Sequence, residues 1–264
     1  MLVSSIQKHE VLLMNLEVED YFAQGLELKP GDTVFDVGAN IGLFSLAAFH
    51  RCGRDLCVYA FEPVRSLHDL LCRNIERNAS SARIEALAYG LSDEAGPVQM
   101  AYYPRASALS TAYPDEEADI GVMREAVLNT IMHLDEAPLA VQCLRWIPQG
   151  IRSGVVQFAL RRALRPLAVT CEMRTLSRFV RERGIQRIDF LKIDVEKAEL
   201  DVLRGIEPED WRKIRQVVVE VHDIGDNIRT ITSLLGQNGL SEIAVSQAPT
   251  LAYSNIHLVA ASRP

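Results

Sequence analysis

The stretch Val34-Phe35-Asp36-Val37-Gly38-Ala39-Asn40-Ile41-Gly42 decides the fold of this chain. Its apolar first half predicts a buried strand, and the small residues that follow predict a tight turn leading into a helix. A strand, turn and helix of this kind form the nucleotide-binding unit of open α/β sheets. The stretch therefore predicts a nucleotide-type cofactor at the end of the first strand.

The residues around this turn distinguish between cofactors. A dinucleotide-binding turn follows Gly-x-Gly-x-x-Gly, whereas this one reads Gly38-x-Asn40-x-Gly42, without a third glycine in register. The carboxylate of Asp36 would repel a pyrophosphate, but it suits the ammonium and sulfonium groups of S-adenosylmethionine. Glu62 ends the next predicted strand, where a carboxylate can accept hydrogen bonds from both ribose hydroxyls. The turn therefore favours S-adenosylmethionine.

Composition limits the class of protein. The chain has 264 residues, of which 48% are hydrophobic and 24% charged, as is typical of a globular α/β domain. A net charge of −7 argues against a nucleic-acid partner, and no apolar run approaches the ~20 residues of a membrane span. Five cysteines without a Cys-x-x-Cys pair argue against a disulfide framework or a zinc site. We therefore expect a cytoplasmic protein with reduced thiols.

Strand-like and helix-like segments alternate, which predicts a mostly parallel sheet with helices on both faces. Strands are predicted at residues 34–37, 58–61, 84–91, 98–103, 188–193 and 216–221, with a closing antiparallel pair at 243–246 and 256–260. The alternation stops at residues 104–170, which we interpret as a helical insertion within a single domain of residues 1–264. Helices are predicted there at about 120–134 and 155–164.

Four stretches, in this order, resemble the FkbM family of S-adenosylmethionine-dependent O-methyltransferases. They are residues 35–42, 60–63, 188–196 (Ile-Asp-Phe-Leu-Lys-Ile-Asp-Val-Glu) and 218–223 (Val-Val-Glu-Val-His-Asp). The resemblance implies a class I methyltransferase fold, which is Rossmann-like with a seven-stranded, mostly parallel sheet. Lys197 stands where the more common family form has glycine. That variant and the insertion resemble the O-methyltransferase domains of polyketide and nonribosomal peptide synthetase assembly lines.

The resemblance also implies where the cofactor binds, at the ends of the first strands. The predicted contacts are Asp36, Gly38, Ala39, Asn40, Gly42, Glu62, Pro63, Ser92 and Asp194. Ser92 follows the third strand, beside the expected adenine, although an ordinary turn with Asp93 is an equal alternative.

Methyl transfer to oxygen requires alignment of the reactants and removal of a proton from the acceptor. Glu196 and His222 follow two predicted strands, at the edge where an open sheet binds its ligands. Neutral imidazole can accept a proton near neutral pH. We therefore predict His222 as the general base and Glu196 as the group that orients it and stabilises its cation. Asp194 would lie beside the transferred methyl, and Glu220 is a weaker candidate for the orienting role.

A metal-dependent mechanism is the alternative for this cluster. Carboxylate and imidazole groups could bind Mg²⁺, and the candidate ligands are Asp194, Glu196, Glu220 and His222. Carboxylates are equally expected beside a catalytic histidine without a metal, and we favour the metal-free form.

The insertion carries a basic segment. Residues 137–171 contain no acidic residue and five arginines, namely Arg145, Arg152, Arg161, Arg162 and Arg165. A basic patch on an acidic chain suits an acidic partner, here an acyl carrier protein with a phosphopantetheine-linked substrate and flanking synthase domains. Trp146, Phe158 and Leu160 could line an acyl tunnel. A solvated basic face over an apolar packing stripe explains the segment equally well.

Other residues have two interpretations each. Ser107, Ser110 and Tyr113 could face the substrate or form an ordinary polar loop. Tyr21 and Phe22 could cover the cofactor as a lid or pack in the core.

The leading prediction is an O-methyltransferase acting on a hydroxyl or enol oxygen of a carrier-bound acyl chain. The first alternative is a free-standing small-molecule or sugar O-methyltransferase of the same family. The second is a nicotinamide-dependent dehydrogenase, against which Asp36 and the missing glycine argue.

Overall fold

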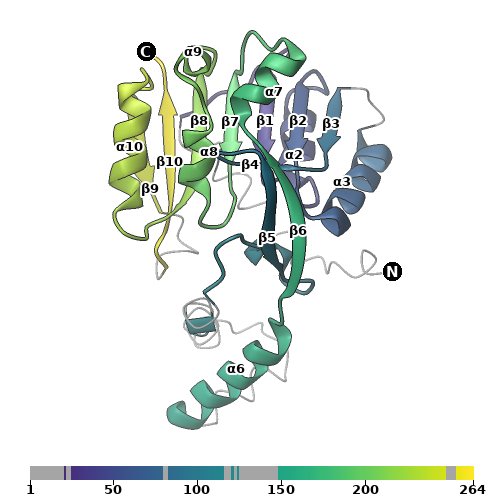
Figure 1. Cartoon of the computed structure of the whole chain (residues 1–264), viewed down its shortest axis with the longest axis vertical. Coiled ribbons are helices and arrows are strands. Elements are labelled where there is room, and N and C mark those ends of the chain that lie inside the picture. Colours follow the sequence, from purple (N-terminus) through teal and green to yellow (C-terminus); the bar gives the residue numbers. More distant parts are fainter. Residues whose placement is uncertain are drawn as a thin grey trace.

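The central sheet contains seven strands in the order β3-β2-β1-β7-β8-β10-β9. The structure, a computed structural model, describes residues 21, 25–79, 83–115, 120–121, 124, 148–247 and 254–264. The strands are β1 (Thr33–Val37), β2 (Cys57–Phe61), β3 (Ile84–Leu87), β7 (Phe190–Ile193), β8 (Gln216–His222), β9 (Glu242–Ser246) and β10 (Ile256–Ser262). β10 lies antiparallel between β8 and β9, while β3, β2, β1, β7 and β8 pair in parallel. The predicted class I α/β fold is therefore confirmed (Figure 1).

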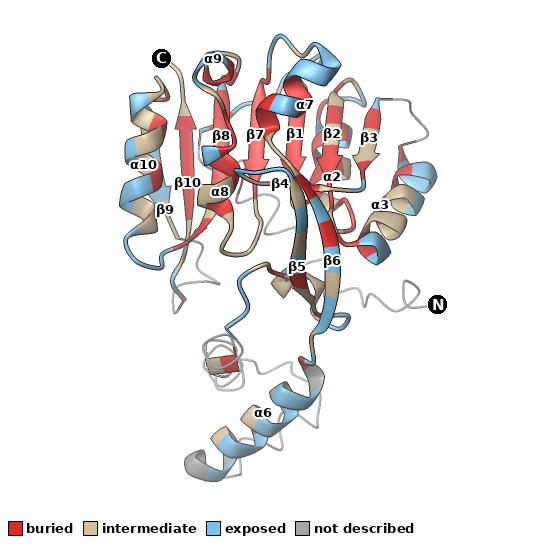
Figure 2. Ribbon diagram, viewed as in Figure 1, coloured by how far each residue is buried: buried red, intermediate tan, exposed pale blue. Residues whose placement is uncertain are grey.

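Helices cover both faces of this sheet, and alternate strand residues face opposite cores. Val34 packs in a cluster with residues of α2 (Leu43–Arg51) and α3 (Arg65–Asn78). Phe35 packs in a second cluster with residues of α7 (Leu176–Arg183), α8 (Glu199–Arg204), α9 (Pro208–Trp211) and α10 (Asn227–Gln237). Because both faces are covered, the central strands are apolar almost throughout, and they are buried in Figure 2.

A second, smaller sheet extends from the first, in the order β4-β6-β5. It contains β4 (Gly90–Leu91), β5 (Gly96–Tyr102) and β6 (Leu167–Arg174). The prediction of one strand over residues 84–91 was wrong, because the chain leaves the central sheet after Leu87 and joins the small sheet at Gly90. Glycine allows this crossing, since a Cβ on Gly90 would lie 2.5 Å from the sulfur of Met173.

The insertion starts and ends at one place, because β5 and β6 pair in antiparallel fashion from Gly96 with Met173 to Tyr102 with Leu167. The predicted insertion, 104–170, therefore extended too far: residues 167–170 belong to β6. They are mostly exposed, so no clean alternation of apolar residues marks them as a strand. The second predicted helix is α6 (Gln149–Ala163), while most of the first lies outside the described residues. Figure 1 shows α6 beyond the end of the β5–β6 pair, away from the central sheet. Within the described ranges, no helix is long and apolar enough to cross a membrane.

Candidate active site

Two adjoining cavities lie at the carboxyl ends of the parallel strands. The first, which we call the donor cavity, has a volume of about 260 Å³ and is lined by Gly38, Glu62 and Asp194, among others. The second, which we call the acceptor cavity, has a volume of about 650 Å³ and is lined by residues including Tyr113 and His222. Three residues line both cavities: Leu109, Glu196 and Ile256.

Glycine is required at the first turn for reasons of space as well as conformation. Gly38 has a φ of 80°, which disfavours other residues, and a Cβ there would lie 1.7 Å from the carbonyl oxygen of Asp194. The amides of Gly38 and Ala39 both donate to the carbonyl of Phe61. The turn thus joins the ends of β1, β2 and β7 at the floor of the donor cavity.

Glu62 presents a buried carboxylate to the donor cavity. Its two oxygens accept hydrogen bonds from the backbone amides of Asn40, at 2.9 Å, and Val64, at 2.8 Å. Burial raises the pKa of Glu62 to about 7, against the lowering effect of these amides. Each carboxylate oxygen has capacity for a further donor, so the group can bind a diol such as a ribose.

The predicted cofactor contacts fall into two groups. Those that line the donor cavity are Gly38, Asn40, Glu62, Pro63 and Asp194. Those that do not are Asp36, Ala39, Gly42 and Ser92. Gly42 is instead needed for packing, since a Cβ there would lie 2.5 Å from Cδ1 of Leu71. The Ser92 hydroxyl donates to Asp93 at 3.1 Å, as in the ordinary turn that was its alternative.

Asp36 faces a buried lysine that the sequence analysis missed. Nζ of Lys192 lies 3.2 Å from carboxylate oxygens of both Asp36 and Asp194, and donates to the carbonyl of Gly38 at 3.0 Å. The other Asp36 oxygen accepts from the Ser45 hydroxyl at 2.6 Å. Burial lowers the pKa of Lys192, but the two carboxylates outweigh it, so the pKa is raised and the lysine is charged. Asp36 therefore already has a cation as its partner. It does not line the donor cavity, as a residue in direct contact with the cationic groups of the cofactor would.

One signal for Lys192 was visible, because it is a charged residue inside the apolar run Phe190-Leu191-Lys192-Ile193. A lysine in a strand buried on both faces needs a partner. Nothing in the sequence shows that this partner includes Asp36, which lies on a different strand.

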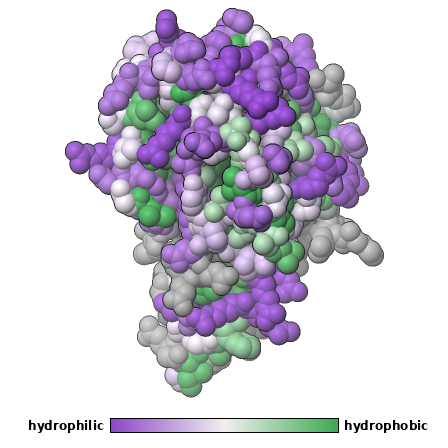
Figure 3. Space-filling model, viewed as in Figure 1, coloured by the Kyte–Doolittle hydropathy of each residue, from purple (hydrophilic) through white to green (hydrophobic). Residues whose placement is uncertain are grey.

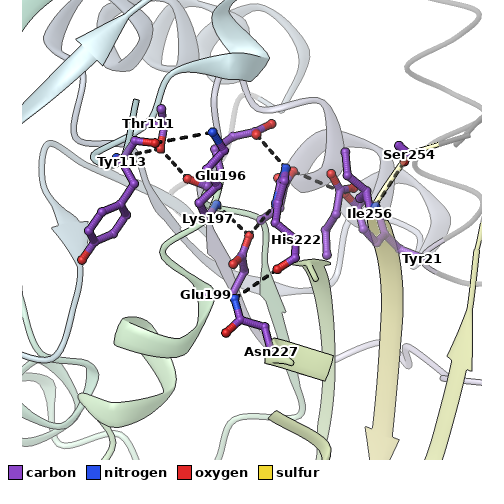
Figure 4. A network of polar contacts seen from close by, with 12 residues as sticks. Tyr21, Thr111, Tyr113, Glu196, Lys197, Glu199, His222, Asn227, Ser254 and Ile256 are labelled. Carbon is purple, nitrogen blue, oxygen red and sulfur yellow. Dashed lines mark hydrogen bonds and ion pairs between the residues drawn. The ribbon is translucent and has the colours of Figure 1, made fainter. Parts of the chain in front are cut away.

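His222 lies between two carboxylates, as Figure 4 shows. Its Nδ1 is 2.8 Å from Oε1 of Glu199 and its Nε2 is 3.1 Å from Oε2 of Glu196. Burial lowers the pKa of His222, but the hydrogen bonds that its ring donates to the two carboxylates outweigh burial and raise the pKa to about 10. Near neutral pH this histidine is a cation with no free lone pair, which conflicts with its predicted role as the general base.

The structure brings Glu196 and His222 together as expected, but the second orienting carboxylate is Glu199 rather than Glu220. Glu199 is fully buried at the start of α8. Its position three residues after Glu196, at the start of a helix, was the available signal. The carboxylate of Glu220 instead lies 3.1 Å from the Tyr21 hydroxyl, which also lies 3.3 Å from Asp194.

The carboxylates of Asp194, Glu196 and Glu220 come within 4.8 Å of one another. They are therefore close enough for one Mg²⁺ ion to bind all three, as the metal-dependent alternative requires. Each of them already faces a donor: Lys192 for Asp194, His222 for Glu196 and Tyr21 for Glu220. Each of the three carboxylates therefore has a partner within the protein, which is compatible with the metal-free form.

The turn after β7 is held in an unusual conformation. Glu196 and Lys197 have φ angles of 48° and 75°, in the left-handed region that favours glycine. The Thr111 hydroxyl donates to the carbonyl of Glu196 at 2.5 Å, and the Lys197 amide donates to Oε1 of Glu199 at 2.9 Å. The start of the insertion thus fastens the turn that presents Glu196.

The insertion's other predicted residues are placed as follows. Ser107 and Ser110 line the donor cavity, and the Ser107 hydroxyl donates to Asn40 at 3.2 Å. Tyr113 lines the acceptor cavity and donates to Asp201 at 2.5 Å. Phe158 is 72% exposed rather than lining a tunnel, and Trp146 and Phe22 lie outside the described residues.

Comparison with known proteins identifies the family. The profile of the methyltransferase FkbM domain matches residues 161–241. The chain is 38% identical over 243 residues to the 31-O-demethyl-FK506 methyltransferase FkbM of Streptomyces tacrolimicus, covering 92% of this chain and 85% of the relative. This chain belongs to the FkbM methyltransferase family. It is a methyltransferase of the S-adenosylmethionine-dependent kind, and the dehydrogenase alternative is wrong.

Two further relatives differ in length. The chain is 32% identical over 244 residues to the methyltransferase sdnD of Sordaria araneosa, covering 89% and 84% of the two chains. It is 34% identical over 259 residues to the AMB antimetabolite synthetase AmbE of Pseudomonas aeruginosa, of which it spans only 11%. A crystal structure of an FkbM methyltransferase from Methylobacillus flagellatus superimposes with a TM-score of 0.51 at 15% identity, over 95% of this chain and 52% of that one, which supports the fold.

Proposed function

We propose that this chain transfers a methyl group from S-adenosylmethionine to a hydroxyl or enol oxygen of an acyl intermediate carried by an acyl carrier protein. The observation that carries the proposal is the pair of adjoining cavities, one suited to a nucleoside and the other large enough for an acyl chain.

The residues of the donor cavity fit this cofactor. Glu62 offers carboxylate oxygens to the ribose hydroxyls, and Asp194 offers a carboxylate near the end of β7 for the cationic groups. Leu67, Met100 and Met173 give the cavity an apolar wall that suits a flat adenine ring. When bound, the cofactor supplies an electrophilic methyl group on a sulfonium. The chain's own residues position the reactants, exclude water and move the acceptor's proton.

A carrier-bound substrate is supported by helix α6. Ile151, Val155 and Phe158 are exposed at spacings of four and three residues, so they lie on one face of the helix. Arg161, Arg162 and Arg165 are exposed at its C-terminal end. Figure 3 shows apolar surface at the lower tip of the molecule, over α6. An apolar face bordered by cations suits an acidic carrier protein, and AmbE, a synthetase, is the relative that suggests an assembly line.

The proposal is tested by giving the purified chain and S-adenosylmethionine matched acyl chains, either on a carrier protein or as small thioesters. Substrates with a β-hydroxyl and with a β-keto (enolisable) group separate the two possible acceptors. A mass increase of one methyl group on the carrier-bound chain is expected, with full activity retained in EDTA. Methylation of free sugars or small phenols in preference to every acyl chain would favour the free-standing alternative. Rescue of activity by Mg²⁺ alone would favour the metal-dependent form.

Charge reversal on α6 tests the partner separately. Arg161→Glu with Arg162→Glu should raise the KM for the carrier-bound chain by about tenfold, as expected for interface charges, while the small thioester is unaffected. The matched control is Arg73→Glu with Arg77→Glu on α3, an equal charge change on exposed residues elsewhere. Equal losses with both forms of substrate would contradict docking on α6.

A further inference from the structure

We propose that the carboxylate of Glu196, and not the imidazole of His222, accepts the proton of the methyl acceptor. The inference rests on the proposed function, because it assigns a role within that reaction.

The position of Glu196 is the first argument. Methyl transfer must occur where the donor and acceptor cavities meet, and only three of their lining residues, Leu109, Glu196 and Ile256, are shared. Of these three side chains only the Glu196 carboxylate can accept a proton. His222 lines the acceptor cavity but not the donor cavity. The carboxylate is therefore closer to the path of the methyl group than the imidazole is.

The hydrogen bonds of His222 are the second argument. Both ring nitrogens lie within hydrogen-bond distance of carboxylates, Glu199 on one side and Glu196 on the other. An ionised carboxylate only accepts hydrogen bonds, so each nitrogen must carry a proton to satisfy its partner. The ring then has no lone pair for the substrate. It acts as a donor that holds Glu196 in place, and Glu199 holds the ring from behind.

Glu196 retains an oxygen for the substrate. Its Oε2 faces His222, whereas Oε1 has no hydrogen-bond partner among the described residues. The carboxylate is 15% exposed, so it is reachable but largely desolvated. The left-handed turn and the Thr111 contact fix the backbone that presents it.

The charges around Glu196 favour proton uptake. Burial raises the pKa of Glu196, the His222 cation lowers it, and Asp194 and Glu199 raise it again. Glu220 adds a further carboxylate within 4.8 Å, while Lys192 pairs with Asp194. A carboxylate surrounded by other acids is a stronger base than one in water, which suits general base catalysis near neutral pH.

The reaction is balanced with Glu196 as the acceptor. The hydroxyl or enol oxygen forms a bond to the methyl carbon, and the bond between carbon and sulfur breaks with its electron pair remaining on sulfur. The oxygen's proton passes to Oε1 of Glu196. The carboxylic acid that results stays hydrogen-bonded to His222 until it loses the proton to water.

A spectroscopic test does not depend on turnover. Nitrogen-15 NMR of the imidazole should show both His222 nitrogens protonated at pH 8, with or without S-adenosylhomocysteine. Glu196→Gln and Glu199→Gln should each lower the pKa at which this signal titrates, and Glu209→Gln on the exposed surface of α9 should not. A neutral ring with one unprotonated nitrogen at pH 8 would overturn the proposal.

A kinetic ranking completes the test. Glu196→Gln should lower kcat by roughly 10²–10⁴-fold, the usual contribution of a general base. His222→Gln keeps a hydrogen-bond donor for Glu196. The decrease in kcat that it causes should therefore be about tenfold smaller than the decrease caused by Glu196→Gln. S-adenosylhomocysteine should still bind to Glu196→Gln, which excludes misfolding, although the melting temperature should fall because the His222 cation loses one of its two carboxylates. A larger loss in His222→Gln than in Glu196→Gln would make the histidine the base. Absence of any turnover by the wild-type chain would refute the proposed function, whereas the NMR result would still decide the protonation of His222.

Discussion

Two buried cations in this molecule have the same surroundings and different uses. Lys192 lies between Asp36 and Asp194 under the cofactor turn, and His222 lies between Glu196 and Glu199 at the end of β8. Neither Lys192 nor Asp36 lines the donor or the acceptor cavity, although Asp194 lines the donor cavity, whereas His222 and Glu196 both line the acceptor cavity. A cation between two carboxylates thus acts as a scaffold when the cation itself is buried away from both cavities. The same arrangement can take part in chemistry when the cation and one of its carboxylates both reach a cavity, as His222 and Glu196 do.

The two cations should respond differently to pH, and this gives the largest expected effect. The pKa of His222 in the folded protein, about 10, lies above the ordinary histidine pKa of 6.5. Its stabilising effect is therefore fully present below pH 6.5 and is lost as the pH rises through 10. By linkage, the raised pKa of His222 contributes on the order of 5 kcal/mol to the free energy of unfolding. Lys192, whose pKa is raised from an already high value, stays charged over this range.

Urea unfolding at several pH values between 6 and 10 measures this effect as the difference between the wild-type chain and His222→Gln. The variant should show a smaller decrease in stability with pH. His50→Gln, at an exposed histidine, is the control and should behave like the wild type. If His222→Gln and the wild type decline in parallel, the two cations do not differ as described.

Removing the sealed cation should destabilise the fold. Lys192→Met leaves two carboxylates, Asp36 and Asp194, without their cation, and breaking a buried pair costs about 3–5 kcal/mol. Urea unfolding at pH 7 measures the loss, and Asp36→Asn in the same chain should restore part of it. Lys29→Met breaks an exposed pair with Glu27 and should cost at most about 1 kcal/mol. A similar small cost for Lys192→Met would show that the buried network does not hold the turn.

The smallest effect is expected where a carboxylate faces the donor cavity without a cation. Glu62→Gln keeps the shape of the side chain but weakens hydrogen bonds to a ribose, which should reduce affinity for S-adenosylhomocysteine by roughly 10- to 100-fold. Calorimetric titration measures the change, and Glu76→Gln on the exposed side of α3 is the control. Unchanged affinity would remove Glu62 from the cofactor site.

Local sequence patterns are sufficient to locate the residues of the donor cavity that the backbone of a strand or a turn positions directly. Gly38, Asn40 and Glu62, which the sequence predicts as cofactor contacts, line the donor cavity, because a strand, a tight turn and a strand end leave clear marks in the sequence. The strand pair β9 and β10 was predicted for the same reason. The strand β6 was not, because its outer half is exposed and its partner β5 lies far away along the chain.

The sequence by itself determined the α/β fold, the cofactor turn, the family and the set of acidic residues and histidine at the ends of β7 and β8. Only the tertiary structure decided which of these groups meet. The sequence predicts Asp36 as a cofactor contact, whereas the structure places Lys192 beside it. The sequence predicts His222 as a general base, whereas in the structure Glu199 occupies its second ring nitrogen. The physical reason is that the charge state of a buried group depends on the neighbours within a few ångströms, and those neighbours come from separate elements that no local pattern connects.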